Sequence, residues 1–303
     1  MSVLVNKAWV LARMYEPDVT IVDCRFMLGQ PDAGRISYEE NHIPGAVFLD
    51  LEKDLSSSVS EHGGRHPLPD TGQLAAKLGK VGINRETRVI AYDDQGGLYA
   101  SRLWWLLSYM GHETVFVMNE GFSAWKDAGY PVSKDQPVRV PTTFTADVHP
   151  EMLVNLEDVR QAMKDPSIVI LDSREFSRYL GLNETIDHTA GHIPGAKNKF
   201  WKGVLQDNGE WKSLDELKEY YKDVPKDHEI IVYCGSGVSA CPNVLALTEL
   251  GYPDVRLYAG SWSDWISYSE NPASSAELWA VTSCWRATCC SPFWHSKSAG
   301  CNP

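Results

Sequence analysis

The stretch EIIVYCGSGVSA, residues 229–240, decides the fold class, because it joins a strand signal to a tight loop and then to a helix signal. Residues 229–233 form a short apolar run rich in β-branched side chains, which is typical of a strand buried in a parallel sheet. Residues 238–250 have the pattern of a helix that Gly251 ends. Further strands are predicted at 167–172 and 255–258, and further helices at 156–163, 213–224 and 261–266. This alternation predicts an α/β fold in which a parallel sheet has helices on both faces.

The chain contains an internal repeat. The segment HIPGA at residues 42–46 recurs at 192–196, and LVN at 4–6 recurs at 153–155. Such agreement in order predicts two tandem domains of ordinary size. We expect one domain at 1–132, a proline-containing linker at 133–150 and a second domain at 151–272.

The last segment, residues 273–303, differs from the rest of the chain. It holds four cysteines and three tryptophans without any hydrophobic period, so we expect it to lie outside the fold. Its Cys284, Cys289, Cys290 and His295 lack the paired spacing of a zinc site, and no metal is expected there.

Composition excludes several classes of function. The 303 residues include 28 Lys and Arg against 40 Asp and Glu, and the resulting net charge of −12 argues against a nucleic-acid partner. No window approaches the roughly 18 uninterrupted apolar residues of a membrane span. The N-terminal stretch has no secretory signal pattern, so a cytoplasmic protein is expected. In such a compartment Cys24, Cys234 and Cys241 remain thiols.

Cys234 is the candidate nucleophile, because it stands between a strand and a glycine-containing loop that leads into a helix. Two glycines allow successive N–H groups to point inward, and the helix adds its positive N-terminal end. Thiol pKa values in such surroundings fall to roughly 3.5–7.5. The alternative is an inert buried cysteine, which we expect for Cys24 and Cys241. A phosphatase loop would need an arginine where Ala240 stands, so that function is disfavoured.

The first half has no thiol at the equivalent position. Its strand signal at residues 89–92 is followed by Asp93 and Asp94, and a one-residue shift leaves open which of them is opposite Cys234. A carboxylate cannot accept sulfur, so the first domain is predicted to be catalytically silent and the second to be active.

With both HIPGA segments, Asp172-Ser173-Arg174 and CGSGVS at 234–239, the chain resembles the tandem rhodanese-domain sulfurtransferases over about residues 3–272. The resemblance implies two five-stranded parallel sheets with the active site at the domain interface. It also implies transfer of a sulfane sulfur through a cysteine persulfide, without a cofactor. The donor would be 3-mercaptopyruvate or thiosulfate. The acceptor would be cyanide or a thiol such as that of thioredoxin.

The resemblance assigns roles to particular residues. Cys234 would carry the persulfide, and Arg178 would bind the anionic donor. His42 and Asp32 would form a relay with Ser236, whereas His192 and the Asp172–Arg174 pair are expected to be structural. The amide cradle around the sulfur would consist of Gly235, Ser236, Gly237, Val238 and Ser239.

Donor choice depends on charge. Residues 182–190 lack the second arginine typical of mercaptopyruvate enzymes, whereas the loop after Cys234 lacks the basic residues typical of thiosulfate enzymes. A dianion loses more than a monoanion when cations are few, so the balance favours mercaptopyruvate. The competing function is a binding module that uses the tandem fold as a scaffold, and the reactivity of the Cys234 thiol would distinguish the two.

Overall fold

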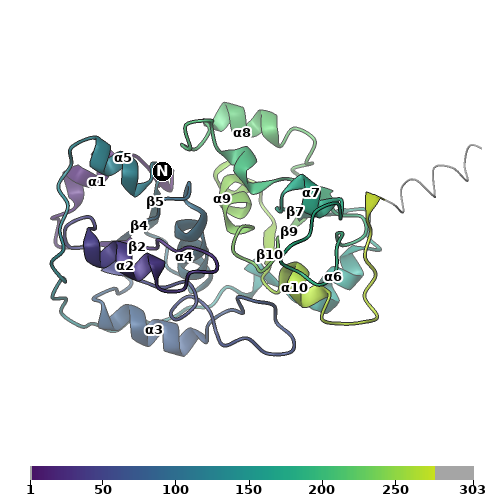
Figure 1. The fold of residues 1–303 in the computed structure, drawn as a ribbon, viewed down its shortest axis with the longest axis horizontal. Coiled ribbons are helices and arrows are strands. Elements are labelled where there is room, and N and C mark those ends of the chain that lie inside the picture. Colours follow the sequence, from purple (N-terminus) through teal and green to yellow (C-terminus); the bar gives the residue numbers. More distant parts are fainter. Residues whose placement is uncertain (1, 277–303) are drawn as a thin grey trace, which may run out of the picture.

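The computed structural model describes residues 2–276 and contains two five-stranded sheets, each built from parallel strands (Figure 1). The predictions for residues 277–303 therefore lie outside the described residues. The first sheet consists of β1 (Leu4–Val5), β2 (Val19–Asp23), β3 (Val47–Phe48), β4 (Arg88–Tyr92) and β5 (Val115–Met118). The second consists of β6 (Leu153–Val154), β7 (Ile168–Asp172), β8 (Lys197–Asn198), β9 (Glu229–Tyr233) and β10 (Val255–Tyr258). Their spatial orders, β1-β5-β4-β2-β3 and β6-β10-β9-β7-β8, are equivalent, which confirms the α/β fold with two tandem copies.

Helices pack against both sheets. The first domain has α1 (Lys7–Arg13), α2 (Ala33–Glu40), α3 (Thr71–Lys80), α4 (Leu98–Tyr109) and α5 (Phe122–Asp127). The second has α6 (Leu156–Ala162), α7 (Phe176–Tyr179), α8 (Leu214–Tyr220), α9 (Cys241–Glu249) and α10 (Ser261–Trp265), with the 3₁₀ turns η1 (Pro150–Met152) and η2 (Trp201–Val204). Within the described residues, none of these helices is long and apolar enough to cross a membrane.

Local sequence signals account for several helix ends. Asn155 and Ser213 each accept hydrogen bonds from the backbone of the first helical turn and complete capping boxes, at the starts of α6 and α8. The helix predicted from residue 238 begins instead at Cys241. Gly237 adopts a left-handed φ of +77°, so residues 237–240 form a turn before the helix.

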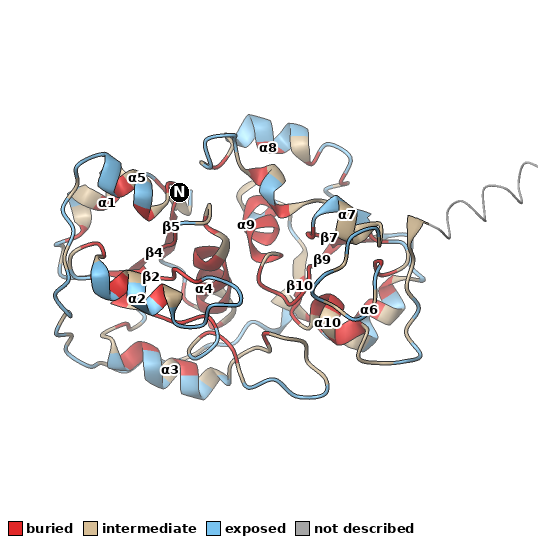
Figure 2. Ribbon diagram, in the orientation of Figure 1, coloured by how far each residue is buried: buried red, intermediate tan, exposed pale blue. Residues whose placement is uncertain are grey.

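One large hydrophobic cluster spans both domains, in addition to a smaller cluster within each. Helices α4 and α9 pack against each other between the sheets, and both are buried along most of their length (Figures 1 and 2). Leu103 and Trp105 of α4 and Val244 and Leu247 of α9 belong to a single cluster that spans the interface. Because this apolar surface is removed from water only when the domains are docked, their relative position is held by the hydrophobic effect.

Each HIPGA segment pairs with the stretch of chain that follows the last helix of its own domain. His42 forms an antiparallel bridge with Ser133, and His192 forms the matching bridge with Ser274. Chain segments that contact each domain therefore continue slightly beyond the boundaries 132 and 272 expected from the sequence.

Candidate active site

Cys234 directly follows β9 and is held from two sides. Its side chain is buried, and its backbone N–H donates to Oγ of Ser261 at 3.0 Å. The Trp262 N–H donates to the Cys234 carbonyl, also at 3.0 Å. Ser261 has a φ of +57°, the one positive value among the described residues other than glycine, and its hydroxyl lies 4.0 Å from Cys234 Sγ. A strained residue at this point indicates that α10 positions the cysteine.

The first domain carries a carboxylate in the same place. Tyr92 and Tyr233 end the equivalent strands β4 and β9, paired with Asp23 and Asp172 respectively. The residue opposite Cys234 is therefore Asp93, which settles the one-residue ambiguity. Asp94 instead accepts hydrogen bonds from the backbone and side chain of Ser123.

Asp93 is fully surrounded by backbone donors. Its carboxylate accepts four N–H groups at 2.7–3.0 Å, those of Gln95, Gly97, Tyr99 and Ala100. Burial raises the pKa of Asp93, although these hydrogen bonds act in the opposite direction. The loop after a strand in this fold thus forms an anion-binding ring of amides.

The Cys234 loop is one residue shorter than the Asp93 loop, and donors at matching positions in it are unused. Gly97 and Gly237 both adopt a left-handed backbone, with φ of +79° and +77°. When these two glycines are aligned, Gly237, Ser239 and Ala240 correspond to Gly97, Tyr99 and Ala100, three of the donors around Asp93. Within residues 2–276, the N–H groups of these three residues have no protein acceptor. The loop can therefore receive an anion beside the thiol.

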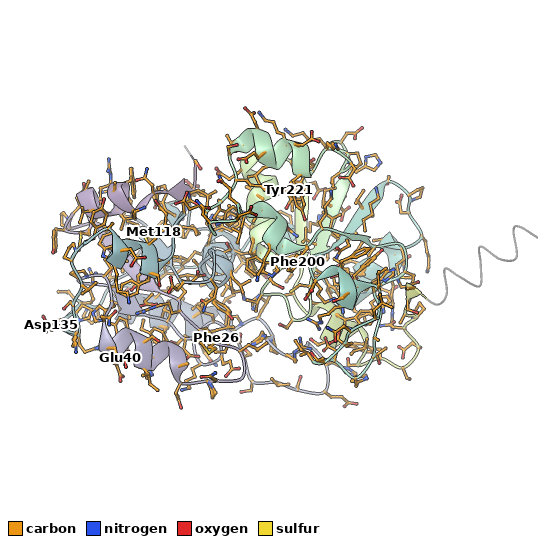
Figure 3. The ribbon with its side chains drawn as sticks, turned by 45° about the horizontal axis from the view of Figure 1, so that its top comes forward. Phe26, Glu40, Met118, Asp135, Phe200 and Tyr221 are labelled. Atoms are coloured by element: carbon orange, nitrogen blue, oxygen red, sulfur yellow. The ribbon has the colours of Figure 1, made fainter. Side chains whose placement is uncertain are left out.

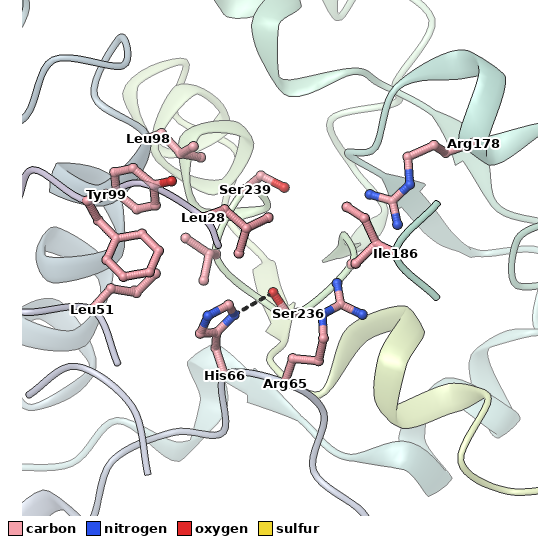
Figure 4. Close-up of a pocket in the computed structure, with 13 residues that line it drawn as sticks. Leu28, Leu51, Arg65, His66, Leu98, Tyr99, Arg178, Ile186, Ser236 and Ser239 are labelled. Atoms are coloured by element: carbon pink, nitrogen blue, oxygen red, sulfur yellow. Dashed lines mark hydrogen bonds between the residues drawn. The ribbon is translucent and has the colours of Figure 1, made fainter. Parts of the chain in front are cut away.

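An open cavity of about 110 Å³ leads to this loop from between the domains (Figure 4). One wall is apolar and comes from the first domain. The opposite wall comes from the second domain and contains Arg178, Ile186 and the loop after Cys234. Arg65 and His66 reach the cavity from the loop between β3 and α3. The apolar wall consists of Phe26, Leu28, Leu51, Leu98 and Tyr99.

Arg178 lies at the cavity as expected, and carboxylates hold one side of its guanidinium group. Its Nε and Nη2 donate to Glu184 at 2.9–3.2 Å, and Nη2 also donates to Asp187 at 2.9 Å. Asp187 forms a second ion pair with Arg65. Burial raises the pKa of Asp187. Although burial acts in the same direction on Glu184, N–H groups of Asp187 and Ile186 and the Arg178 guanidinium lower its pKa overall.

The histidine beside the loop is His66. Its Nδ1 lies 2.8 Å from Oγ of Ser236, and its Nε2 lies 4.0 Å from Oε1 of Glu52 (Figure 4). Burial, reinforced by the charges of Arg102 and Arg65, lowers the pKa of His66 to about 4. The imidazole is therefore neutral at physiological pH and can exchange a proton with the serine hydroxyl.

The structure does not bring His42 and Asp32 to Ser236, as the expected relay requires. His42 is buried, its Nδ1 lies 2.7 Å from the Tyr38 carbonyl, and its Nε2 lies 3.1 Å from the Asp135 carbonyl. Figure 3 places Asp135 at the outer edge of the first domain, away from the interface. Asp32 pairs with Lys53 on the exposed surface. The HIPGA histidine is thus a structural residue in the first copy, as was expected for His192 in the second, where Nδ1 lies 2.7 Å from the Tyr179 carbonyl.

Arg102 of α4 fastens the first domain to the Cys234 loop. It is fully buried and donates to the carbonyls of Gly237 at 3.0 Å, His66 at 3.2 Å and Leu55 at 3.5 Å. Among the described residues it has no carboxylate partner, although a guanidinium stays charged in proteins. Burial lowers the pKa of Arg102, and the nearby sulfurs of Cys241 and Cys234 act in the opposite direction.

The Asp172–Arg174 pair has a structural position. Arg174 donates to Asp172 at 2.6 Å and to the Gly191 carbonyl at 2.6 Å, which ties β7 to the second HIPGA segment. Asp23 and Arg25 form the same contact in the first domain, where no thiol is present. A pair that occurs in both copies serves the shared architecture.

The structure thus brings Cys234, its loop and Arg178 together, and adds residues that sequence reasoning missed: Arg65, His66, Arg102 and Ser261. Arg65 and His66 stand in the sequence GGRHPLP, which has no copy in the second half. A histidine and an arginine in a glycine-containing loop that is not repeated could have indicated these two site residues from the sequence.

Comparisons with known proteins agree with this geometry. A family model described as rhodanese-like domain matches residues 6–128 and 155–268. A probable 3-mercaptopyruvate sulfurtransferase of Pseudomonas aeruginosa is 39% identical over 280 residues, which cover 90% of this chain and 98% of that protein. The thiosulfate sulfurtransferase of Rattus norvegicus is 33% identical over 259 residues, with coverages of 82% and 86%.

A solved structure of the same class of enzyme also matches this chain. The crystal structure of SseA, a 3-mercaptopyruvate sulfotransferase of Escherichia coli, has a TM-score of 0.78 and 34% sequence identity, and the match covers 87% of this chain and all of that one. Twin domain matches, relatives above 30% identity over most of both chains, and the paired parallel sheets lead to one assignment. The chain belongs to the tandem rhodanese-domain sulfurtransferases, enzymes that take sulfur from 3-mercaptopyruvate or thiosulfate.

Proposed function

We propose that Cys234 carries the sulfur as a persulfide and that the first domain, with Asp93 in its loop, is catalytically silent. The observation that supports this most strongly is the ring of N–H groups around Asp93. A carboxylate oxygen lies two bonds beyond Cβ, as the terminal sulfur of a cysteine persulfide does. The equivalent loop after Cys234 would therefore hold a persulfide anion where the first domain holds its own carboxylate.

The first half-reaction is a displacement at sulfur. The Cys234 thiolate attacks the donor sulfur, a new S–S bond forms, and the bond between that sulfur and the rest of the donor breaks with its electron pair. Thiosulfate then leaves as sulfite. Mercaptopyruvate leaves as the enolate of pyruvate, which takes up a proton to become pyruvate. In the second half-reaction cyanide or a thiol attacks the outer sulfur and regenerates the thiolate.

We propose 3-mercaptopyruvate as the preferred donor. An enolate leaving group needs a proton, whereas sulfite does not, and the Ser236–His66 hydrogen bond of 2.8 Å provides a path for one beside the loop. The charges near the cavity also favour a monoanion, because Glu184 and Asp187 offset Arg178 and Arg65. The apolar wall of the cavity suits a carbon-containing donor.

The acceptor is proposed to be a small thiol, thioredoxin or cyanide, and the compartment the cytoplasm. Cys24, Cys234 and Cys241 are all free thiols in the structure, which fits a reducing environment. We propose domain boundaries near 1–132 and 151–272, joined by residues 133–150.

Mass spectrometry tests this proposal. After incubation with mercaptopyruvate and removal of the excess donor, the wild type should gain one sulfur atom on the peptide that contains Cys234. Cys234→Ser should neither gain sulfur nor turn over, while Cys24→Ser, which removes another buried thiol, should behave as the wild type. Steady-state kinetics with donor and cyanide should follow a ping-pong scheme. Sustained turnover by Cys234→Ser would contradict the proposal.

A further inference from the structure

Three arginines are buried among the described residues, and one of them has no carboxylate partner. Arg25 donates to Asp23 at 2.6 Å, and Arg174 donates to Asp172 at the same distance. The hydrogen bonds of Arg102 to oxygen all go to backbone carbonyls, and its Nε has no partner in the described part of the chain. A guanidinium stays charged, and burying a charge costs free energy unless an opposite charge compensates it. The position of Arg102 therefore indicates that an anion forms close to it.

Two thiols are candidates for this anion. Negative charge on Cys241 or Cys234 would raise the pKa of Arg102, which burial lowers. Arg102 also donates to the Gly237 carbonyl at 3.0 Å, in the middle of the loop that begins at Cys234. His66, whose carbonyl is a further acceptor, contributes no charge at neutral pH because its pKa is about 4.

Cys241 remains a protonated thiol. Its Sγ donates to the Gly237 carbonyl at 3.3 Å, and this hydrogen bond requires the proton on sulfur. Burial raises the pKa of Cys241 to about 12, although Arg102 acts in the opposite direction.

Cys234 has the surroundings of an anion. The N–H groups of Gly237, Ser239 and Ala240 in its loop have no acceptor within the described residues. Unused backbone donors and a buried positive charge both favour the ionised form of a thiol.

Two other guanidinium groups reach this loop, but carboxylates balance their charges. Arg65 and Arg178 both pair with Asp187, and Arg178 also pairs with Glu184. Arg102 is thus the positive charge at the loop that no carboxylate of the described residues offsets.

We propose that Arg102 of the first domain is the buried counter-ion that keeps Cys234 of the second domain as a thiolate. It acts through its charge and through the Gly237 carbonyl, without touching the donor. This inference rests on the proposed function, in which Cys234 is the nucleophile, and adds the group that ionises it. The persulfide formed on Cys234 is also an anion, so the charge of Arg102 stays balanced in both half-reactions.

The pH dependence of Cys234 alkylation tests the counter-ion without donor or turnover. Iodoacetamide is a neutral reagent for thiolates, and peptide mass spectrometry separates Cys234 from the other cysteines. In Arg102→Gln, which removes the charge but keeps a donor for a carbonyl, we expect the thiol pKa to rise by at least about one unit. At a pH below that pKa the alkylation rate should then fall about ten-fold, while the plateau rate at high pH stays within about three-fold.

Two further variants separate charge from shape. Arg102→Lys keeps the charge but loses the planar fork, so its thiol pKa should stay within about half a unit of the wild type. Arg85→Gln removes an exposed arginine of the same domain and should leave the thiol pKa unchanged.

A stability measurement decides the matter if Arg102→Gln folds poorly. In the Cys234→Ser background the charge of Arg102 has no anion, so Arg102→Gln should lower the urea midpoint by less than half as much as it does in the wild type. Equal losses in the two backgrounds would overturn the counter-ion, as would a double variant that does not fold.

The alkylation profiles have equally clear outcomes. A wild-type thiol pKa at the ordinary value of about 8.5, or one that Arg102→Gln leaves unchanged, overturns the inference. A rise of a full unit in Arg102→Lys also overturns it, because the shape of the guanidinium would then matter and its charge would not. A lowered pKa that Arg102→Gln raises, in a protein that forms no persulfide with either donor, contradicts the proposed function instead and leaves the counter-ion standing.

Discussion

Replacing Asp187 with asparagine should change the donor preference of the enzyme. The amide keeps the size of the side chain and an oxygen for one arginine, but removes a negative charge that lies 2.9 Å from Nη2 of Arg178. A donor anion on the other side of the guanidinium groups would be roughly 6 Å from that charge, which at an effective dielectric constant of about 20 corresponds to a repulsion of about 3 kcal/mol. A dianion experiences about twice this repulsion, so it gains more from the substitution.

The measured effect should be smaller, because water enters the open cavity and screens the charges. We expect the ratio of kcat/KM for thiosulfate to kcat/KM for mercaptopyruvate to rise about ten-fold, or about 1.4 kcal/mol of differential transition-state binding. The assay measures both donors with cyanide as the common acceptor. Asp207→Asn is the matched control, because it makes the same change on an exposed side chain of the second domain and should leave the ratio unaltered.

The measured ratio distinguishes an effect of the Asp187 charge from an effect of Asp187 on the positions of the arginines. A ratio that stays constant while both kcat/KM values fall would show that Asp187 acts only by holding the arginines in place. A ratio that shifts towards mercaptopyruvate would refute the electrostatic reasoning altogether.

Three further predictions concern the surroundings of the thiol. Gly235→Ala would place a methyl group 2.9 Å from Nη2 of Arg65, at the movable end of a flexible side chain, so the melting temperature should change little while the donor KM rises. An unchanged KM would show that the donor does not bind against this residue. His66 titrates at about 4 in the fold and at 6.5 when unfolded, so its contribution of about 3 kcal/mol is present above pH 6.5 and lost as the pH falls towards 4. His66→Gln should therefore show a smaller loss of unfolding free energy between pH 7 and pH 4.5 than the wild type, and equal losses would argue against a buried neutral imidazole. Ser261→Ala removes the acceptor of the Cys234 N–H, which should cost about 1–3 kcal/mol of unfolding free energy and slow persulfide formation; full stability in urea melts would contradict that role.

Sequence patterns were sufficient for the fold because they report local events. The strands predicted at 229–233 and 255–258 have the bounds that the structure shows, and the helices predicted at 156–163 and 213–224 begin at the capping residues Asn155 and Ser213. The predicted helix starts at residue 238, three residues before α9, because the apolar pattern continues through a turn that depends on the backbone of Gly237. Cys24, expected to be an inert buried cysteine, is buried directly after the end of β2.

The candidate site was only half predictable, for a physical reason. Cys234 and its loop are consecutive in the chain, so their arrangement follows from local conformation. Arg65 and His66 reach the same cavity from the other domain, through packing of α4 on α9 and docking of a loop on α10. No periodicity encodes such a contact. The HIPGA histidine misled the assignment because its repeated motif reflects a shared fold, and His42 is used there to bind the Tyr38 and Asp135 carbonyls.

The loop at residues 62–66 has a consequence for how the two copies evolve. A duplicated domain that loses its thiol would ordinarily be free to drift or to be deleted. Here the first copy contributes His66 to Ser236 of the second copy and Arg65 to an ion pair with its Asp187, so the two halves depend on each other rather than being interchangeable modules. Cutting the linker and expressing residues 151–276 alone would leave a thiol loop without its histidine. Substitutions that alter this pocket should accordingly arise in pairs across the interface, one in each half, instead of accumulating within the domain that contains Cys234.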